Sequence, residues 1–351
     1  MIVLGIAAVA VILLGGALYQ ARAAARDLRR VPPTGQLVDL GGGRRLHAHC
    51  SGAGAPAVIL EAGIAASSLS WTRVQPRVAQ FTRVCSYDRA GLGWSDPGRS
   101  PLSAAANAES LHLLLRALGI PLPYVLVGHS YGSFIIREYA NRYRNEVAGI
   151  VLVDPIWPSE WVQPTRELQR RLRGGVFLSH VGGLLARVGF VRVCLRLLTG
   201  GAPGLARRAS RLFGSEASGV LSRLVGEVQK LPAETWPLVQ ALWSQPKCFT
   251  AMARHLAALP RSAGEQATCG ELGDIPTLVI TGGRQPEQCR AEQQRLAALS
   301  SRWRQIVAAG SGHWVHFDEP ELVIEAIREV VNDVCCAGKH TLAPLVNVKS
   351  D

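Results

Sequence analysis

The sequence predicts an α/β protein whose mostly parallel sheet is covered by helices on both faces, with a helical insertion and an apolar N-terminal helix. Three observations lead to this prediction. Apolar segments typical of buried strands alternate with helical segments over residues 37–157, as in parallel sheets covered on both faces. Over residues 158–272 helical periodicity continues without a strand-like segment, and the alternation resumes over 273–336. Residues 2–19 form an almost unbroken apolar run.

This N-terminal run contains 18 residues from Ile2 to Tyr19 without a charge. As a helix rising about 1.5 Å per residue it reaches roughly 27 Å, close to the bilayer core of about 30 Å. We therefore expect residues 1–20 to form an uncleaved membrane anchor, followed by a linker over 21–36. The alternative is a cleaved secretory signal, since Ala21 and Ala23 are small residues after the run, and the protein would then be secreted. The flanking charges leave the membrane orientation open.

Residues 37–157 contain the first part of the predicted sheet. The glycines in "QLVDLGGGRRLHAHC" predict a hairpin at its start. Apolar strands follow in "AVILEAG", "RVCSYD", "YVLVGHS" and "VAGIVLVDP", with helical segments around 71–78, 103–118 and 134–143 between them. This order predicts parallel strands joined by helices.

Residues 158–272 are predicted to form a helical cap inserted between two strands of the sheet. The second part of the core, 273–336, holds a strand in "TLVITGG", a last strand around residues 304–307, and a final helix. Asp318, Pro320 and Glu321 have the spacing of a helix start. Residues 337–351 show no periodicity and are predicted to be a C-terminal tail.

The composition is that of a globular protein, with 351 residues of which 48% are hydrophobic and 18% charged. Its net charge of +12 is concentrated in residues 161–230, where twelve basic residues face three acidic ones. No nucleic-acid motif accompanies this charge, so we expect no nucleic-acid partner. Contact between the basic cap and an anionic membrane is one interpretation, and solvated helix faces are the simpler one.

The eight cysteines show no C-x-x-C spacing and indicate no metal site. In an exported domain, Cys248, Cys269 and Cys289 could supply a disulfide, although no pairing can be read from their positions.

A nucleophile is indicated by "GHSYG", residues 128–132, because this G-x-S-x-G lies directly between a predicted strand and a predicted helix. A serine on such a tight turn needs small neighbours, which Gly128 and Gly132 supply. The amide of Tyr131 would then lie at a helix start, where an unpaired N–H can face an oxyanion. Ser130 is the predicted nucleophile.

Ser130 needs a base, because a serine hydroxyl is a poor nucleophile at neutral pH. His313 lies on the predicted loop between the last strand and the last helix, from which it can reach the carboxyl edge of the sheet. His316 is the rival candidate but lies closer to the helix start. His129 lies inside the turn and is expected to pack beneath it.

Four stretches, "LEAGIAASSLSW", "YDRAGLGWSD", "GHSYG" and "GSGHWVHFDEPELV", occur in family order, and through them the chain resembles the α/β-hydrolase superfamily from about residue 37 to 335. The resemblance is to its lipase-, esterase- and haloperoxidase-like members. It implies the α/β-hydrolase fold and hydrolysis without a metal or organic cofactor. It also implies that the Ile64 amide completes an oxyanion hole with Tyr131, and that Asp88, Arg89 and Asp96 are structural ion-pairing residues.

The catalytic acid is the uncertain part of the triad. In many relatives it follows the strand at "TLVITGG", but here Gln285 occupies that position and the first acid is Glu287. The preceding core strand, "GIVLVDPIW", ends at Asp154, a position that some superfamily members use. We expect Asp154 to orient the histidine and to leave Gln285 outside the proton relay. Glu287 is the alternative acid, and an Asp-Pro turn is the structural explanation of Asp154.

The predicted function is hydrolysis of a carboxylic ester with an apolar substrate through an acyl-enzyme on Ser130, and a lipid-derived ester is one interpretation of that substrate. Serine at this position argues against epoxide hydrolase and dehalogenase chemistry, which in those relatives uses a carboxylate nucleophile. Two alternatives remain: an aminopeptidase-like amide hydrolase, which should need an acidic residue in the cap, and a catalytically silent binding protein tethered to the membrane.

Overall fold

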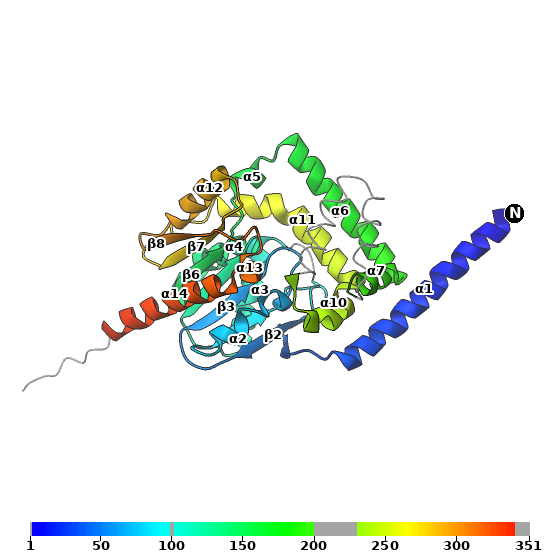
Figure 1. Cartoon of the computed structure of the whole chain (residues 1–351), viewed down its shortest axis with the longest axis horizontal. Helices are drawn as coiled ribbons and strands as arrows, with labels where there is room; N and C mark the ends of the chain where they lie inside the picture. Colours follow the sequence, from blue (N-terminus) through cyan, green and yellow to red (C-terminus); the bar gives the residue numbers. More distant parts are fainter. Residues whose placement is uncertain (1, 99–101, 200–229, 341–351) are drawn as a thin grey trace, which may run out of the picture.

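The computed structural model describes residues 2–98, 102–199 and 230–340 and has the predicted α/β architecture (Figure 1). In this part of the chain, one sheet contains eight strands in the order β1-β2-β4-β3-β5-β6-β7-β8. β1 and β2 run antiparallel to their neighbours, whereas β4, β3, β5, β6, β7 and β8 are mutually parallel. The strands are β1 (Gln36–Asp39), β2 (Arg45–Ser51), β3 (Ala57–Glu61), β4 (Val84–Tyr87), β5 (Tyr124–His129), β6 (Val147–Val153), β7 (Thr277–Gly282) and β8 (Trp303–Ala308).

Helices lie in the connections between the strands, and one further helix precedes the sheet along the chain. Those outside the N-terminal helix and the predicted cap are η1 (Ser68–Trp71), α2 (Gln75–Val78), α3 (Ala104–Ala117), α4 (Gly132–Arg142), η2 (Arg144–Glu146), α12 (Glu287–Ala297), α13 (Val315–Asp318) and α14 (Pro320–His340). The others are α1 (Ile2–Arg30), α5 (Ser159–Val162), α6 (Arg166–Arg187), α7 (Phe190–Thr199), η3 (Ala233–Thr235), α10 (Trp236–Trp243) and α11 (Pro246–Gln266).

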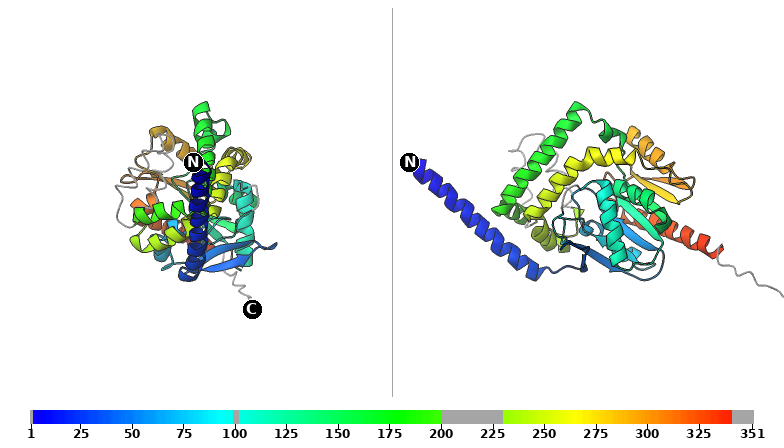
Figure 2. Two further views of the ribbon diagram at one scale, coloured as in Figure 1. Left: turned by 90° about the vertical axis from the view of Figure 1, so that its right-hand side faces the viewer. Right: turned by 180° about the vertical axis from the view of Figure 1, so that it is seen from behind.

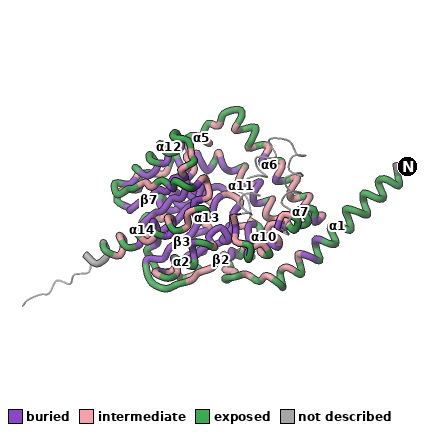
Figure 3. Tube along the Cα trace, viewed as in Figure 1, coloured by how far each residue is buried: buried purple, intermediate pink, exposed green. Residues whose placement is uncertain are grey.

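Side chains that alternate along the parallel strands build a separate core on each face of the sheet. On β5, Leu126 packs in one cluster with Leu111 of α3 and Phe134 of α4. Its neighbour Val127 points to the opposite face and packs with Ile327 of α14. Figure 3 shows these buried segments at the centre of the molecule. Both faces are therefore buried, which is why the strands are apolar without a polar alternation.

The N-terminal hairpin forms as predicted, but the disulfide does not involve the expected cysteines. β1 and β2 pair antiparallel around the glycine-rich turn. Cys50 of β2 is bonded to Cys85 of β4, its direct partner in the antiparallel ladder. Cys248, Cys269 and Cys289 are free thiols. The expectation for these three was wrong because strand register, which the spacing of cysteines does not reveal, brings Cys50 and Cys85 together.

The helices α5, α6, α7, η3, α10 and α11 lie between β6 and β7 along the chain. α6 and α11 run side by side in Figure 1. Their close approach involves Gly182, where an added Cβ would lie 2.5 Å from the Phe249 ring. The predicted cap, 158–272, includes residues 200–229, which lie outside the described residues.

Helix α1 is longer than the predicted anchor and projects from the domain (Figure 2). It continues to Arg30, so the expected linker over 21–36 is wrong for its first ten residues. The alanine-rich stretch 21–25 favours continued helix, and Pro32 and Pro33 disfavour helix just beyond it. Its second half packs on the cap, where Arg192 of α7 pairs with Asp27 and donates from Nε to Gln20 Oε1 over 2.9 Å.

The final helix has Pro320 in its first turn as predicted, but Asp318 does not cap it. Pro320 starts α14, but the Asp318 carboxylate turns away from the helix start. It accepts a hydrogen bond of 3.2 Å from Ser311 Oγ and pairs with Lys230. Glu319, directly before α14, accepts a hydrogen bond from the Gly310 amide through Oε1 over 2.9 Å. α14 reaches His340, beyond the predicted start of the tail at 337, and residues 341–351 lie outside the described residues.

Candidate active site

Ser130 lies on the turn between β5 and α4, in a backbone conformation that is rare for a residue with a side chain. Its φ is 52°, in the left-handed region. The turn is possible because the residues two positions before and two positions after Ser130 are glycines. A Cβ at Gly128 would lie 2.8 Å from the Ile136 side chain, and one at Gly132 would lie 2.8 Å from Ala62 O. Backbone strain of this kind is typical of functional sites.

Tyr131 follows the serine and stands at the N-cap of α4. The first amides of a helix have no partner within it, so this position can serve an anion. The Tyr131 ring is buried, and its hydroxyl lies 3.1 Å from Ser262 Oγ of α11. Burial raises the pKa of the Tyr131 phenol to about 12. Its side chain therefore fastens the turn to the cap, while its backbone lies beside Ser130.

Asp154 and His313 come together from segments that are far apart in the sequence. Asp154 directly follows β6, with a φ of 41°, and is buried. His313 lies on the loop between β8 and α13. The His313 ring donates from Nδ1 to Asp154 Oδ2 over 2.6 Å. The Asp154 side chain has no exposed surface, whereas 37% of the His313 side chain is exposed. The imidazole is thus held at one nitrogen and open elsewhere.

Three further donors surround the Asp154 carboxylate. Gln285 Nε2 lies 2.5 Å from Oδ2, while Gln293 Nε2 and the Gly282 amide each lie 3.1 Å from Oδ1. Burial acts to raise the pKa of Asp154, but the hydrogen bond and charge of His313, with Gln293 and Gly282, outweigh it and lower this pKa. Asp154 is therefore held as a carboxylate.

Gln285 was expected to stand outside the proton relay, and the structure adds that its side-chain amide donates a hydrogen bond to the Asp154 carboxylate. The turn after β7 carries its amide back to the end of β6, because β6 and β7 are adjacent parallel strands. Glu287, the alternative acid, is exposed in the first turn of α12.

The other two candidate histidines are buried around His313. His129 donates from Nε2 to the backbone oxygen of His313 over 2.9 Å and so ties the serine turn to the histidine loop. Burial, followed by the charge of His313, lowers the pKa of His129 to about 3. His316 packs against His129 and Trp71, and burial lowers its pKa well below the usual value. Among the described residues, no hydrogen bond joins Ser130 Oγ to a histidine.

The loop after β3 lies against the serine turn and is held by Arg89. A Cβ at Gly63 would lie 3.5 Å from the Ser130 Cβ. Arg89 donates from Nη1 to Ala62 O over 2.7 Å and from Nη2 to Gly63 O. The Gly63 carbonyl and the Ile64 amide belong to one trans peptide, so they point in opposite directions. Arg89 therefore sets the direction of the Ile64 N–H.

Arg89 is itself held by a buried partner. Glu61, at the end of β3, pairs with Arg89 and accepts the hydroxyl of Tyr87. Burial acts to raise the pKa of Glu61, Arg89 and Tyr87 act to lower it, and the net shift is upward. The resemblance to related hydrolases implied only a structural ion-pairing role for Arg89. Its place in the "YDRAG" stretch, which carries part of the resemblance, indicated a structural role. It did not indicate that Arg89 contacts the loop after β3.

The other two residues of that loop motif make structural contacts, Asp88 with the imidazole of His47 and Asp96 in an ion pair with Arg45. Asp88 lies 2.8 Å from His47 Nδ1 and accepts the Ser68 amide over 2.7 Å, all within buried surroundings. Asp96 pairs with Arg45 over 2.9 Å.

Gln293 was missed in the sequence. A signal for it was present, because it follows Cys289 by four residues and precedes Leu296 by three on α12, which places an amide on the buried face of the helix. A buried amide among apolar residues needs a hydrogen-bond partner.

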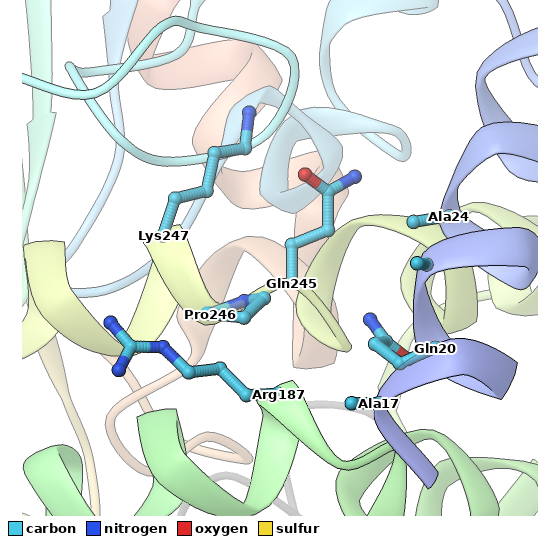
Figure 4. Close-up of a pocket in the computed structure, with 8 residues that line it drawn as sticks. Ala17, Gln20, Ala24, Arg187, Gln245, Pro246 and Lys247 are labelled. Atoms are coloured by element: carbon cyan, nitrogen blue, oxygen red, sulfur yellow. The ribbon is translucent and has the colours of Figure 1, made fainter. Parts of the chain in front are cut away.

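A cavity of about 340 Å³ lies elsewhere, between α1 and the start of α11 (Figure 4). Arg187 and Lys247 line it together with Ala17, Gln20, Ala21, Ala24, Gln245 and Pro246. Ser130, His313 and Asp154 are not part of its lining. In the part of the chain that the structure describes, no group of three or more His, Cys, Asp or Glu side chains is arranged to hold a metal ion.

Comparison with known proteins identifies a matching family. The profile of the alpha/beta hydrolase family matches residues 46–326. A haloalkane dehalogenase from Sphingobium indicum is 28% identical over 310 residues, covering 82% of this chain and 92% of that protein. The probable transporter efuK from Hormonema carpetanum is 27% identical over 317 residues, which cover 84% of this chain. The chain spans only 42% of the length of that relative.

Similarity of fold extends to solved structures. A thermophilic esterase from Thermogutta terrifontis superposes with a TM-score of 0.57 at 18% identity, covering 85% of this chain and 97% of the esterase. At this identity the likeness concerns the fold alone.

Proposed function

The chain belongs to the alpha/beta hydrolase family, and we propose that it is a serine hydrolase that cleaves a carboxylic ester through an acyl-enzyme on Ser130. The observation that carries the proposal is the 2.6 Å hydrogen bond from His313 to a buried Asp154, next to a serine with a φ of 52°. Nucleophile, base and orienting acid are the three parts that acyl transfer through serine requires.

His313 is proposed to move the proton. Because Nδ1 donates to Asp154, Nε2 is left without a proton and can accept the one on Ser130 Oγ as this oxygen bonds to the ester carbon. The imidazolium then gives the proton to the departing alcohol. A water molecule repeats the sequence and releases the acid from Ser130. Asp154 stays ionised throughout and stabilises the positive ring.

The oxyanion that forms in both steps is proposed to accept hydrogen bonds from the backbone amides of Ile64 and Tyr131. The Tyr131 amide stands at the start of α4, and the Ile64 amide is directed by the hold of Arg89 on Gly63 O. Fixed donors of this kind need no reorganisation when the charge develops. Arg89 acts through the loop and is a positioning residue.

An ester is proposed over other substrates because of the nucleophile. The Sphingobium indicum relative is described as a haloalkane dehalogenase, but the carboxylate nucleophile used for that chemistry is replaced here by Ser130. An aminopeptidase-like activity should need an acidic group in the cap to hold the substrate amine, and the cap is predominantly basic, with twelve basic and three acidic residues over 161–230.

We also propose that α1 is an uncleaved membrane anchor. It is long and apolar enough to cross a bilayer. Cleavage after Ala23 would separate Gln20 from Arg192 and cut a helix that is packed on the cap. Intact-mass measurement of the protein purified from membranes tests this proposal: we expect residues 2–23 to be present, and their absence would support the secreted form.

Labelling by a fluorophosphonate tests the nucleophile. The folded protein should be labelled at Ser130, and Ser130→Ala should abolish labelling while leaving the unfolding temperature in place. A folded wild-type protein that resists the reagent would favour the silent binding protein. A panel of p-nitrophenyl esters then tests the acyl group, since a strong preference for short chains would contradict an apolar, lipid-derived substrate.

A further inference from the structure

The outer face of α6 and α7 exposes an apolar stripe next to the membrane helix. Its members are the exposed large apolar residues of these two helices and are called the cap face below: Phe177, Leu184, Phe190, Val193 and Leu197. Phe177 and Leu184 are seven residues apart and lie in one row of α6, whereas Phe190, Val193 and Leu197 are three and four residues apart and lie in one row of α7. The fractional exposure of Phe177 reaches 66%. A stripe of this size on a folded domain indicates contact with a partner or a membrane.

The charges around the cap face have one sign. Residues 168–199 contain six arginines and no Asp or Glu. Arg173 and Arg187 are exposed on α6 in the same row as Phe177 and Leu184. Arg196 of α7 donates to the hydroxyl of Tyr19 on α1. Aromatic and aliphatic residues beside arginines are the composition of helices that lie in a membrane interface.

Helix α1 limits the distance between the cap and a bilayer. An added Cβ at Gly15 would meet no atom within 4 Å, whereas one at Gly16 would lie 2.5 Å from Val188 O. Only the segment 2–15 stands clear of the cap. At about 1.5 Å per residue it is roughly 21 Å long, which is shorter than a hydrocarbon core of about 30 Å. Immersing the apolar run up to Tyr19 brings the corner between α6 and α7 to the headgroups.

The arrangement of the helices is consistent with this depth. α1 leaves the domain beside α7, and α6 runs from that corner across the direction in which α1 extends (Figures 1 and 2). A membrane crossed by α1 would therefore have α6 and α7 along its surface.

We propose that the cap face lies on the surface of an anionic phospholipid bilayer, with its apolar side chains at the acyl boundary and its arginines at the phosphates. This inference rests on the proposed insertion of α1 and not on catalysis. It would place the cap of the hydrolase against the lipid layer, where apolar esters are dissolved.

Quenching by brominated lipids tests the proposal on the full-length protein. A fluorescent amino acid replaces Leu13, Phe190 or Val307 in separate variants, reconstituted in phosphatidylcholine vesicles with or without phosphatidylglycerol. Leu13 reports insertion of α1, and Val307, exposed on β8, is the matched position away from the cap. We expect quenching at Phe190 to reach at least about half of that at Leu13, because interfacial helices bury their apolar face. We expect none at Val307.

Quenching at Leu13 without quenching at Phe190 would overturn the inference while leaving the anchor intact. No quenching at either position would remove the anchor and the inference together, and cross-linking of two chains through Phe190 would assign the face to a second copy. Fluorophosphonate labelling of Ser130 in the same vesicles reports separately on the hydrolase.

The arginines are tested in the same vesicles. Arg173→Gln with Arg187→Gln should reduce quenching at Phe190 about twofold in anionic vesicles and leave it unchanged in neutral ones, because each removed charge weakens attraction to the surface. Arg290→Gln on α12 is the matched exposed control. An equal effect in both lipids would contradict the role of anionic headgroups.

Discussion

The side-chain amide of Gln285 lies 2.5 Å from Asp154 Oδ2, the oxygen that also accepts the His313 ring. Gln285 occupies the turn after β7, where the resemblance to related hydrolases places the acid, and Asp154 occupies the end of β6. The two positions are adjacent at one edge of the sheet. A carboxylate at either position could therefore reach the same histidine. In this chain Asp154 supplies the carboxylate, and Gln285 at the other position donates a hydrogen bond to it.

Replacing the two candidate acids one at a time should give very different results. Asp154→Asn is expected to lower kcat by about 10⁴-fold, because the histidine loses the partner that sets its tautomer and stabilises its charge. Glu287→Gln should have almost no effect, since Glu287 is exposed at the start of α12. Ester hydrolysis by the two purified variants provides the measurement. Loss of turnover in Glu287→Gln alone would show that the assignment of the acid is wrong.

Moving the acid to the position of Gln285 should restore part of the activity. Asp154→Asn combined with Gln285→Glu exchanges the amide and the carboxylate across the same contact. We expect the double variant to exceed Asp154→Asn by at least about 10-fold in kcat, because a carboxylate again faces the imidazole. Gln285→Glu alone should be impaired, since two carboxylates would then share one site.

The control for this exchange is Gln293→Glu with Asp154→Asn. Gln293 contacts Oδ1, the oxygen that does not accept the His313 ring. Equal rescue by both double variants would argue against a specific role for the Gln285 position.

Arg89→Lys should slow the reaction without unfolding the protein. Lysine keeps a positive charge beside Glu61, but it lacks the fork that contacts Ala62 O and Gly63 O together. Loss of one oxyanion donor costs about 10² to 10³ in kcat. A displaced amide should cost less, about 10-fold or more in kcat, with KM little changed.

Arg45→Lys is the matched control, because Arg45 pairs with Asp96 near the surface. The fluorophosphonate labelling rate should fall in parallel with kcat for Arg89→Lys only. A change confined to the unfolding temperature would reduce Arg89 to a purely structural residue.

Buried histidines should make the protein less stable in mild acid. Burial, with the charge of Arg89, lowers the pKa of His255 to about 3, so the folded state stays neutral where the unfolded chain, with a pKa near 6.5, binds a proton. The stabilisation that comes from keeping His255 neutral is therefore fully present above pH 6.5 and is lost as the pH falls toward 3. Each such histidine contributes up to about 1.4 kcal/mol per pH unit within this window.

The measurement is the unfolding free energy in denaturant between pH 4 and 7. His255→Leu should reduce the slope by about one proton relative to the wild type. An unaltered slope in His255→Leu would show that this histidine is protonated in the folded state.

Local patterns in the sequence were sufficient to predict the fold and the polar centre. Apolar strands alternating with helices predicted the parallel sheet, and "GHSYG" between a strand and a helix predicted the turn at Ser130. His313 and Asp154 were predicted because both follow strands that end at one edge of the sheet, and the structure brings them to 2.6 Å. Such features depend on short segments, and a turn or a strand needs few residues to specify it.

The contacts between distant segments depend on the tertiary structure. Gln285 and Gln293 reach Asp154 because β6 and β7 are neighbours and α12 folds back over their ends. Cys50 meets Cys85 through the register of β2 and β4, and Arg89 reaches the loop after β3 through the pairing of β3 with β4. The docking of α1 on the cap has the same origin. These partners are separated by at least 26 residues in the chain, so packing, rather than local pattern, determines which of them meet.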